Sequence, residues 1–496
     1  MDYVAGVSMT GVRAAAVLVL MLICISCGET YRPVATPIPP LPPSPAFSHL
    51  AVVISGNGSA HFGASTTIDV SGDSAVSQSI LGLVPTQAAL VKNATSVYVT
   101  NSGDDTVSAF SPSSAVPVTT ISLPTGSRPT FAATTEGATV YIANSGSNTV
   151  TAIDTVSNVI EAPLPGIPVG VNPVALAETP NQQYLYSANQ GTGGSGGSVT
   201  SIDPVDRTVN PPIANATWIS PVFVVARSDS NRVYVLDQGN GLVSAIDTAA
   251  NAVVNSVSVG AGANFMAYDP TRNRVYVANP AKNTVTYLDA SSDALSPVVI
   301  PVTNPISVAA LPDGSRAYIA SGTVNGGNVT LRVTVINALT GSVSSTIPIS
   351  TVPKVCASNP SELSIAASAD STRVYVGNCD AGNVAIIQTL NDTIVLQMPA
   401  PLSAAQPSTL DITAATQSGP NTTYAYTLIS GPPLVVGAFI TIENMADLGN
   451  NGSFSIIGVG TGTFTVVNPS GVTAGSQDGS GSSVKPQNPV FVVAGP

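Results

Sequence analysis

Short hydrophobic stretches with tyrosine at the second position recur through most of the chain. Each is rich in Val, Ile, Leu and Ala and ends in Asn, Asp or Ser, a pattern typical of a buried strand followed by a turn. The tyrosines stand 43, 45, 48, 42, 42 and 57 residues apart. A period of about 40 to 45 residues with several short strands per repeat predicts a β-propeller. The seven stretches are Val97–Asn101, Val140–Asn144, Leu185–Asn189, Val233–Asp237, Val275–Asn279, Ala317–Ser321 and Val374–Asn378.

Each repeat can be divided into four strands. The first follows a proline that stands 12 to 15 residues before the tyrosine, as in Pro221–Ala226, and the second is the tyrosine stretch. The third follows a turn rich in Gly, Asn and Ser and ends in aspartate, as in Thr149–Asp154, and the fourth is less regular, as in Val253–Val259. We expect the aspartate to cap its turn. The prolines are Pro85, Pro129, Pro173, Pro221, Pro305 and Pro360.

The run Tyr98-Val99-Thr100-Asn101 resembles the motif that names the YVTN family of β-propeller repeats, which occur in bacterial and archaeal surface proteins. Its seven recurrences extend the resemblance over residues 85 to about 398. The resemblance implies a propeller fold, but it says less about activity, because fold and activity separate readily. A tyrosine copied into every repeat indicates packing, with its hydroxyl hydrogen-bonded, and not seven active sites.

Both ends of the repeat region predict a closed ring. Three candidate strands precede the first repeat and resemble the second, third and fourth strands of a blade: Leu50–Ser55, Thr66–Val70 and Val76–Ile80. Near the other end, Asn488–Ala494 nearly repeats the first strand Ser220–Ala226. We therefore expect one blade to be completed by both ends, which removes exposed sheet edges. Eight blades are favoured, with seven as the alternative.

An inserted module is predicted between the repeats and the closing strand. Alternating runs separated by Gly and Asn indicate a small all-β unit over residues 408–485. We expect Ala474–Ser483, rich in Gly and Ser, to be a flexible tail that leads back into the ring. The module either recognises a partner or is a decoration of the ring. Its candidate strands are Thr423–Ile429, Ala438–Glu443, Gly452–Ile457 and Thr463–Val467.

Residues 1–26 predict an export signal. Arg13 is followed by the apolar run Ala14–Ile25, whose 12 residues fall short of the about 20 that a membrane-spanning helix needs. The end of this segment resembles the bacterial lipoprotein signal, in which the cysteine, here Cys27, is lipidated and becomes the first mature residue. Cys24 and Ile25 depart from the usual pattern, so an ordinary signal peptide with Cys27 as an unpaired thiol is the alternative.

The residues after Cys27 indicate the expected cellular location and the domain boundaries. Gly28 is not the aspartate of an inner-membrane retention signal, so the resemblance favours the outer membrane or the cell surface. Residues 27–47 are proline-rich and predict a stiff tether. The propeller is then expected over residues 48–407, with residues 486–496 supplying its closing strand.

Composition narrows the possible partners. The 496 residues include 15 basic and 27 acidic side chains, giving a net charge of −12. No Lys/Arg cluster is present, so nucleic-acid binding is not expected, because it requires a concentrated basic surface. The expected partners are the membrane, through the lipid anchor, and an envelope protein, peptide or glycan.

Candidate chemistry is sparse. Cys356 and Cys379 flank the first two strands of the last repeat, so an antiparallel pair brings them together, and an oxidising compartment favours a disulfide over two free thiols. His49 and His61 are too few for a metal site. Asp104, Asp105 and Asp380 lack the dense pattern of a dedicated calcium loop. We therefore assign no catalytic, cofactor or metal residues.

Two functional hypotheses follow. The first is a non-catalytic, lipid-anchored propeller that acts as a binding scaffold at the bacterial surface. The alternative is an enzyme with its site at the mouth of the central channel, because propellers of similar fold include lactonases and cofactor-dependent oxidoreductases. The scarcity of ionisable side chains favours the scaffold.

Overall fold

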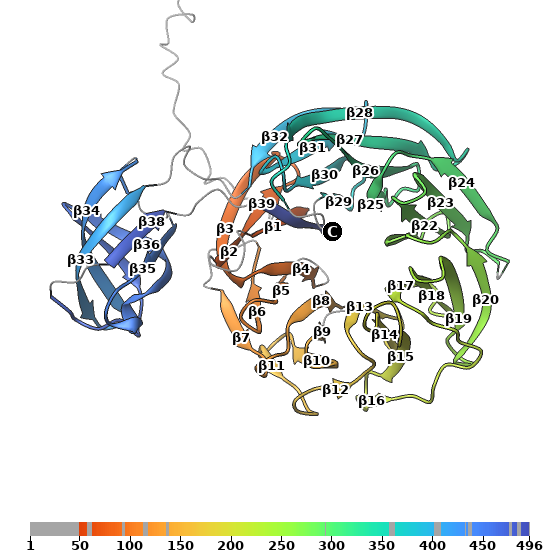
Figure 1. Ribbon diagram of the computed structural model, residues 1–496, viewed down its shortest axis with the longest axis horizontal. Helices are drawn as coiled ribbons and strands as arrows, with labels where there is room; N and C mark the ends of the chain where they lie inside the picture. Colours follow the sequence, from red (N-terminus) through yellow and green to blue (C-terminus); the bar gives the residue numbers. More distant parts are fainter. Residues whose placement is uncertain are drawn as a thin grey trace, which may run out of the picture. The chain divides into compact units, whose positions relative to one another are not determined.

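The computed structural model describes residues 49–56, 62–91, 95–112, 118–134, 138–292, 294–356, 363–400, 408–431, 433–434, 439–475, 479–483 and 488–495. In this part of the chain, eight antiparallel sheets are arranged around one axis (Figure 1). We number these sheets as blades 1 to 8, starting with the sheet that contains the first described strand. The predicted all-β propeller fold is confirmed.

The strand bounds agree with the repeat pattern. Blade 1 contains β39 (Asn488–Ala494), β1 (Leu50–Gly56), β2 (Phe62–Asp69) and β3 (Ser74–Leu83). Blade 2 contains β4 (Pro85–Leu90), β5 (Val97–Asn101), β6 (Thr106–Phe110) and β7 (Thr119–Ser122). Blade 3 contains β8 (Pro129–Ala133), β9 (Thr139–Asn144), β10 (Thr149–Asp154), β11 (Val159–Ile160) and β12 (Ile167–Pro168). Blade 4 contains β13 (Pro173–Glu178), β14 (Leu185–Asn189), β15 (Ser198–Asp203) and β16 (Thr208–Val209).

The other four blades have the same strand order. Blade 5 contains β17 (Pro221–Ala226), β18 (Arg232–Asp237), β19 (Leu242–Asp247) and β20 (Ala252–Ser258). Blade 6 contains β21 (Phe265–Asp269), β22 (Arg274–Asn279), β23 (Thr284–Asp289) and β24 (Pro297–Pro301). Blade 7 contains β25 (Pro305–Ala310), β26 (Arg316–Asn325), β27 (Asn328–Asn337) and β28 (Ser342–Pro353). Blade 8 contains β29 (Leu363–Ala367), β30 (Arg373–Asn378), β31 (Asn383–Gln388) and β32 (Thr393–Pro399).

Prolines mark where most innermost strands begin. Five of the six predicted prolines are the first residues of β4, β8, β13, β17 and β25, and Pro360 lies outside the described residues. In each of these five strands the register shifts directly after the proline. Proline is tolerated at the start of a strand and at bulges because its missing N–H breaks no further ladder bond there.

The hydrophobic core is divided into layers between neighbouring blades. The second strand of a blade is buried on both faces, as in β5 and β14, where all five residues are buried. Eight hydrophobic clusters each combine residues of two adjacent blades, and together they follow the whole ring. Burial on both faces explains why these strands are almost continuously apolar.

The last strand closes the ring. The innermost strand of blade 1 is β39, which pairs antiparallel with β1 from Ala51 with Ala494 to Gly56 with Asn488. β39 also contacts β29 of blade 8 and β4 of blade 2. Figure 1 shows this strand, coloured dark blue, beside the first strands of the chain. The predicted split blade is therefore present, with β1, β2 and β3 as its second to fourth strands.

The module between β32 and β39 is a closed six-stranded barrel. Its strands are β33 (Thr409–Ser418), β34 (Asn421–Ser430), β35 (Phe439–Glu443), β36 (Gly452–Gly460), β37 (Thr463–Val467) and β38 (Gly479–Ser483), with the short 3₁₀ helix η4 at Leu448–Asn450. The expected flexible tail over Ala474–Ser483 is wrong in its last half, because β38 pairs with both β33 and β35 and closes the barrel. The barrel core includes Tyr424 stacked on Phe464, with ring centroids 5.3 Å apart.

The strand directions define two ends of the ring. We call the end with the first-to-second and third-to-fourth strand turns the base, and the opposite end the top. Because β1 is a second strand, it begins at the base, next to His49. The connection to the barrel leaves the end of β32 and returns at the start of β39, so both of its junctions with the ring lie at the top.

Candidate functional site

Of the predicted site residues, the disulfide is confirmed. Cys356 and Cys379 are bonded, with sulfurs 1.98 Å apart and Cα atoms 6.1 Å apart. The bond ties the segment after blade 7 to the end of β30 at the top of the ring. Cys27 and His61 lie outside the described residues. Within those residues, no helix is long and apolar enough to cross a bilayer.

The top-face carboxylates bind backbone N–H groups. Asp105 accepts hydrogen bonds from the N–H groups of Gly126 and Arg128, both at 2.7 Å. Asp380 accepts from the N–H groups of Val355 and Cys356, and its other oxygen lies 3.1 Å from the Lys354 ammonium. These bonds hold one loop to the next. No group of three or more His, Cys, Asp or Glu in the described ranges is arranged to hold a metal ion.

The Asn that ends the second strand fixes the third strand. Asn144 is fully buried and donates to the hydroxyls of Thr149 and Thr151 at 3.1 and 2.8 Å. Asn101 makes the matching bonds to Thr106 and Ser108 in blade 2. These bonds pair the N–H groups of a buried side-chain amide, which would be destabilising without an acceptor.

The aspartates that end the third strands cap their turns, as expected. Asp154 accepts from the N–H groups of Val156 and Ser157 at 3.1 and 2.7 Å. Asp203 makes the corresponding bonds to Val205 and Asp206. The hydrogen bonds from the Ser157 side chain and backbone lower the pKa of Asp154. These carboxylates stabilise turns at the base.

Each repeat tyrosine faces the next blade. All seven are at most 3 % exposed and belong to the layer between their own blade and the following one. The hydroxyls of Tyr98, Tyr141, Tyr234 and Tyr318 are hydrogen-bonded, as predicted. Those of Tyr186, Tyr276 and Tyr375 are buried without such a bond to the described residues, which corrects the expectation for these three.

In blades 2 and 7, the tyrosine hydroxyl donates to a turn residue with positive φ in the next blade. Tyr98 donates to Oδ1 of Asn158 at 2.6 Å, and Tyr318 donates to Oδ1 of Asp392 at 2.6 Å. Asn158 and Asp392 have φ of 58° and 55°. Each stands four residues after the last residue of its blade's third strand. We call the tyrosine, the residue two before it and this turn residue the inter-blade clamp.

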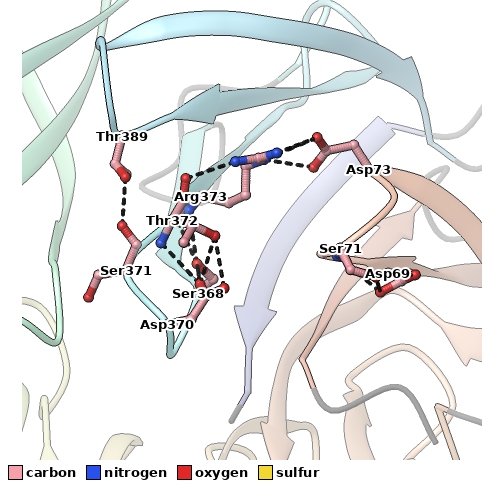
Figure 2. Close-up of polar contacts among 9 residues, drawn as sticks. All are labelled: Asp69, Ser71, Asp73, Ser368, Asp370, Ser371, Thr372, Arg373 and Thr389. Carbon is pink, nitrogen blue, oxygen red and sulfur yellow. Dashed lines mark hydrogen bonds and ion pairs between the residues drawn. The ribbon is translucent and has the colours of Figure 1, made fainter. Parts of the chain in front are cut away.

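In two clamps, an ion pair joins the blades. Arg316 stands two residues before Tyr318 and lies 3.1 Å from Asp392. Arg373 stands two residues before Tyr375, and its guanidinium binds both carboxylate oxygens of Asp73 at 2.9 to 3.0 Å. Figure 2 shows that this bidentate pair joins blade 8 to the turn between β2 and β3 of blade 1. It therefore reinforces the interface at which the ring closes.

We expect Arg373→Ala to lower the free energy of unfolding by about 1–3 kcal/mol, because a charge-assisted, half-buried bidentate pair is lost. The double substitution Arg373→Asp with Asp73→Arg should recover part of the loss, since Arg207 already occupies the same turn position in blade 4 with φ of 54°. Urea unfolding of both single variants and the double variant measures the coupling. Single variants within about 0.5 kcal/mol of the wild type would contradict the clamp's stabilising role.

These arginines were not identified from the sequence as functional or structural. Arg232, Arg274, Arg316 and Arg373 occupy the same position in four successive repeats, so the signal was present. Arg232 pairs with Asp247 of its own blade, whereas the acceptors of Arg274, Arg316 and Arg373 belong to the following blade. Only the ring geometry shows which turn each of these three arginines meets.

A small pocket opens at the base between blades 3 and 4. Glu178 is 8 % exposed, and its negative charge acts with burial to raise the pKa of Tyr141. The Tyr141 hydroxyl therefore stays protonated to a higher pH than that of an exposed tyrosine. Nearby, Arg207 and Glu161 are paired at 2.6 Å. The arrangement can hold a small polar group. The pocket is lined by Ala138, Thr139, Tyr141, Glu178, Gln182, Pro204 and Val205.

Comparison with known proteins supports the architecture. The dihydro-heme d1 dehydrogenase NirN, solved in complex with DHE, aligns with 73% of this chain and 75% of its own, at 12% identity and a TM-score of 0.53. Apo AztD from Citrobacter koseri aligns with 71% of this chain and 94% of its own, at 11% identity and a TM-score of 0.51. The fold is a β-propeller. At such identities the likeness extends to the fold alone.

Sequence comparison adds no family. No protein-family model matches the chain, and no curated protein matches it significantly. The resemblance to the YVTN family therefore rests on the repeated motif itself.

Proposed function

We propose that this protein is a lipoprotein of the bacterial cell envelope, located at the outer membrane or cell surface, whose propeller is a non-catalytic binding scaffold. Its anchor is a lipid on Cys27, and its partner is an envelope protein, peptide or glycan. The recognition module is the barrel between residues 408 and 485.

The insertion of the barrel is the observation that carries this proposal. The barrel closes on itself through β33 and β38 and has its own core, so the ring needs none of its side chains to complete a blade. Both of its junctions with the ring lie at the top, whereas the predicted tether joins the ring at the base. A separately folded unit whose junctions lie at the other end of the ring from His49 supports a role in recognition.

The use of polar side chains in the ring also supports a scaffold. The repeat Asn residues fix third strands, the turn Asp residues cap turns, and Arg316 and Arg373 join neighbouring blades. These recurrent polar side chains thus stabilise strands and turns within blades, and in two places they join neighbouring blades.

Replacing residues 408–485 with a short Gly/Ser linker should abolish capture of a specific partner from envelope extract, because the ring would remain closed but lack its recognition module. Captured proteins are identified by mass spectrometry, purified and tested again for direct binding. Size-exclusion chromatography and circular dichroism must show that the shortened chain is still a folded monomer. Equal direct binding with and without the barrel would refute its role, and lactone hydrolysis or dehydrogenase activity of the purified chain would favour the enzyme alternative.

Radiolabelled fatty acid should be incorporated into the wild-type chain and absent from Cys27→Ala. Cys24→Ala is the matched control, since it removes a neighbouring thiol from the export signal and should keep the label. Labelling that persists in Cys27→Ala would disprove the assigned anchor.

A further inference from the structure

Four base turns expose an aliphatic side chain at the same position. The residue two after the end of the third strand is Val156, Val205, Leu339 or Leu390 in blades 3, 4, 7 and 8. These side chains are 90, 79, 67 and 82 % exposed. We call these four residues the base tips.

The turns themselves do not require aliphatic side chains. The Asp or Asn two residues before the base tip accepts a hydrogen bond from the backbone N–H of Val156, Val205 or Leu339, at 2.8 to 3.1 Å. In blades 1, 5 and 6 the same position is Ser71, Ala249 and Ser291. Any of these residues makes the turn, so the turn geometry alone does not select Val or Leu at four equivalent positions.

The base tips suit a flat partner. Equivalent positions in a ring of similar blades lie at about the same height along the axis, so the four side chains define one plane. They belong to blades spread around the ring and do not converge on a groove that a peptide could fill. A bilayer surface can contact all four at once.

The point where the chain joins the ring matches this arrangement. The described chain begins at His49, immediately before β1, at the base of blade 1. Blades 7 and 8 precede blade 1 around the ring, and blades 3 and 4 follow it after blade 2. The two pairs of base tips therefore flank the point from which residues 1–48 extend, and these residues include Cys27.

We propose that the base of the propeller lies on a phospholipid bilayer, with the base tips inserted at the level of the headgroups and upper acyl chains. This inference rests on the lipid anchor of the proposed function and adds an orientation to it. The barrel junctions then lie on the side of the ring that faces away from the membrane.

The base charges select the kind of bilayer. Asp154 and Asp203 are engaged within their own turns, and Asp73 is paired with Arg373. Asp206 and Asp313 are exposed at the base, together with one exposed basic residue, Arg272. A zwitterionic surface therefore fits better than an anionic one, and insertion should depend little on salt, because apolar contact drives it.

Single-tryptophan variants test the orientation. The chain has one tryptophan, Trp218, so Trp218→Phe provides the background. Leu390→Trp and Val156→Trp place the probe at base tips. The matched control is Val324→Trp on the hairpin between β26 and β27, which is 57 % exposed and projects from the top. The full lipidated chain is bound to vesicles of phosphatidylethanolamine and phosphatidylcholine with brominated acyl chains.

Tryptophan at either base tip should be quenched several-fold more than tryptophan at position 324. Because the replaced side chains are largely exposed, thermal melting should match that of the background. Nitroxide labels on single cysteines at the same three positions give a second readout that leaves Trp218 in place. Equal quenching at all three positions in vesicle-bound protein would overturn the orientation while the anchor stands. Failure of the full lipidated chain to float with vesicles would overturn both.

Discussion

Raising the pH from about 8 to about 11 should sharply lower the free energy of unfolding of the propeller. Burial raises the pKa of Tyr98 and Tyr186 to about 12, and it also raises the pKa of the equivalent tyrosine in the other five repeats. An unfolded tyrosine ionises near pH 10. The stabilising effect is therefore fully present below about pH 10 and is lost as the pH rises toward the folded pKa.

The expected size follows from the number of repeats. At about pH 11 each unfolded tyrosine gains about 1.4 kcal/mol from ionisation that the buried residue does not gain. The pKa is raised far enough for this full effect in five of the seven residues, which gives on the order of 7 kcal/mol, a large part of the whole stability of a typical domain. We therefore expect urea to unfold the protein at a much lower concentration at about pH 11 than at about pH 8, as followed by circular dichroism.

Two phenylalanine variants separate ionisation from hydrogen bonding. Tyr186→Phe removes a hydroxyl without a bond to the described residues, so it should change stability little at about pH 8 and reduce the alkaline loss by about 1.4 kcal/mol. Tyr98→Phe should give the same alkaline relief, but it loses the 2.6 Å bond to Asn158 and starts about 1 kcal/mol less stable. If both variants lose as much stability as the wild type between the two pH values, buried tyrosines are not the cause.

The sequence repeat explains why most strands of the ring could be predicted from the sequence. A blade cannot bury both faces alone, so the same apolar strand and the same turn residues must return at each blade. The third strand Thr149–Asp154 has the predicted bounds for this reason. The closing strand was detectable because β39 and β17 occupy the same innermost position and share the run Pro-Val-Phe-Val-Val-Ala.

The strand β38 could not be predicted, because Gly479–Ser483 has almost no intrinsic preference for a strand. Its conformation is imposed by the unpaired edges of β33 and β35, which it joins. Small residues are needed there, since a Cβ on Gly481 would lie 3.1 Å from Ile412 and 3.3 Å from Leu410. Here tertiary contact, and not local sequence, determines the structure.

The inter-blade clamps and the base tips could not be predicted from the sequence for a different reason. The sequence displays Arg373 and Asp73 300 residues apart, with nothing to indicate that they meet. Likewise, Val156 and Leu390 read as single apolar residues in polar turns. The clamps can be recognised only once the ring places each turn beside the neighbouring blade. The base tips can be recognised only once the ring places equivalent turns at the same end.

Removing residues 488–496 should cause the largest loss of stability of any single change in the ring. The deletion takes away β39, which exposes the edge of β1 and opens the layers on both sides of blade 1. Val492 is 3 % exposed and packs in the layer that contains Tyr375. Lost apolar burial and ladder hydrogen bonds together amount to on the order of 5 kcal/mol or more.

We expect the truncated chain to aggregate through the exposed edge and to unfold at much lower urea than the wild type. A circular permutant that carries residues 486–496 directly before residue 47 is the matched control. It restores β39 beside β1 as one hairpin, because Ala494 pairs with Ala51 in the native ring. The permutant should be monomeric and unfold close to the wild type. A truncated chain that remains monomeric and equally stable would show that the ring holds without its closing strand, because the layers between the other blades would then suffice.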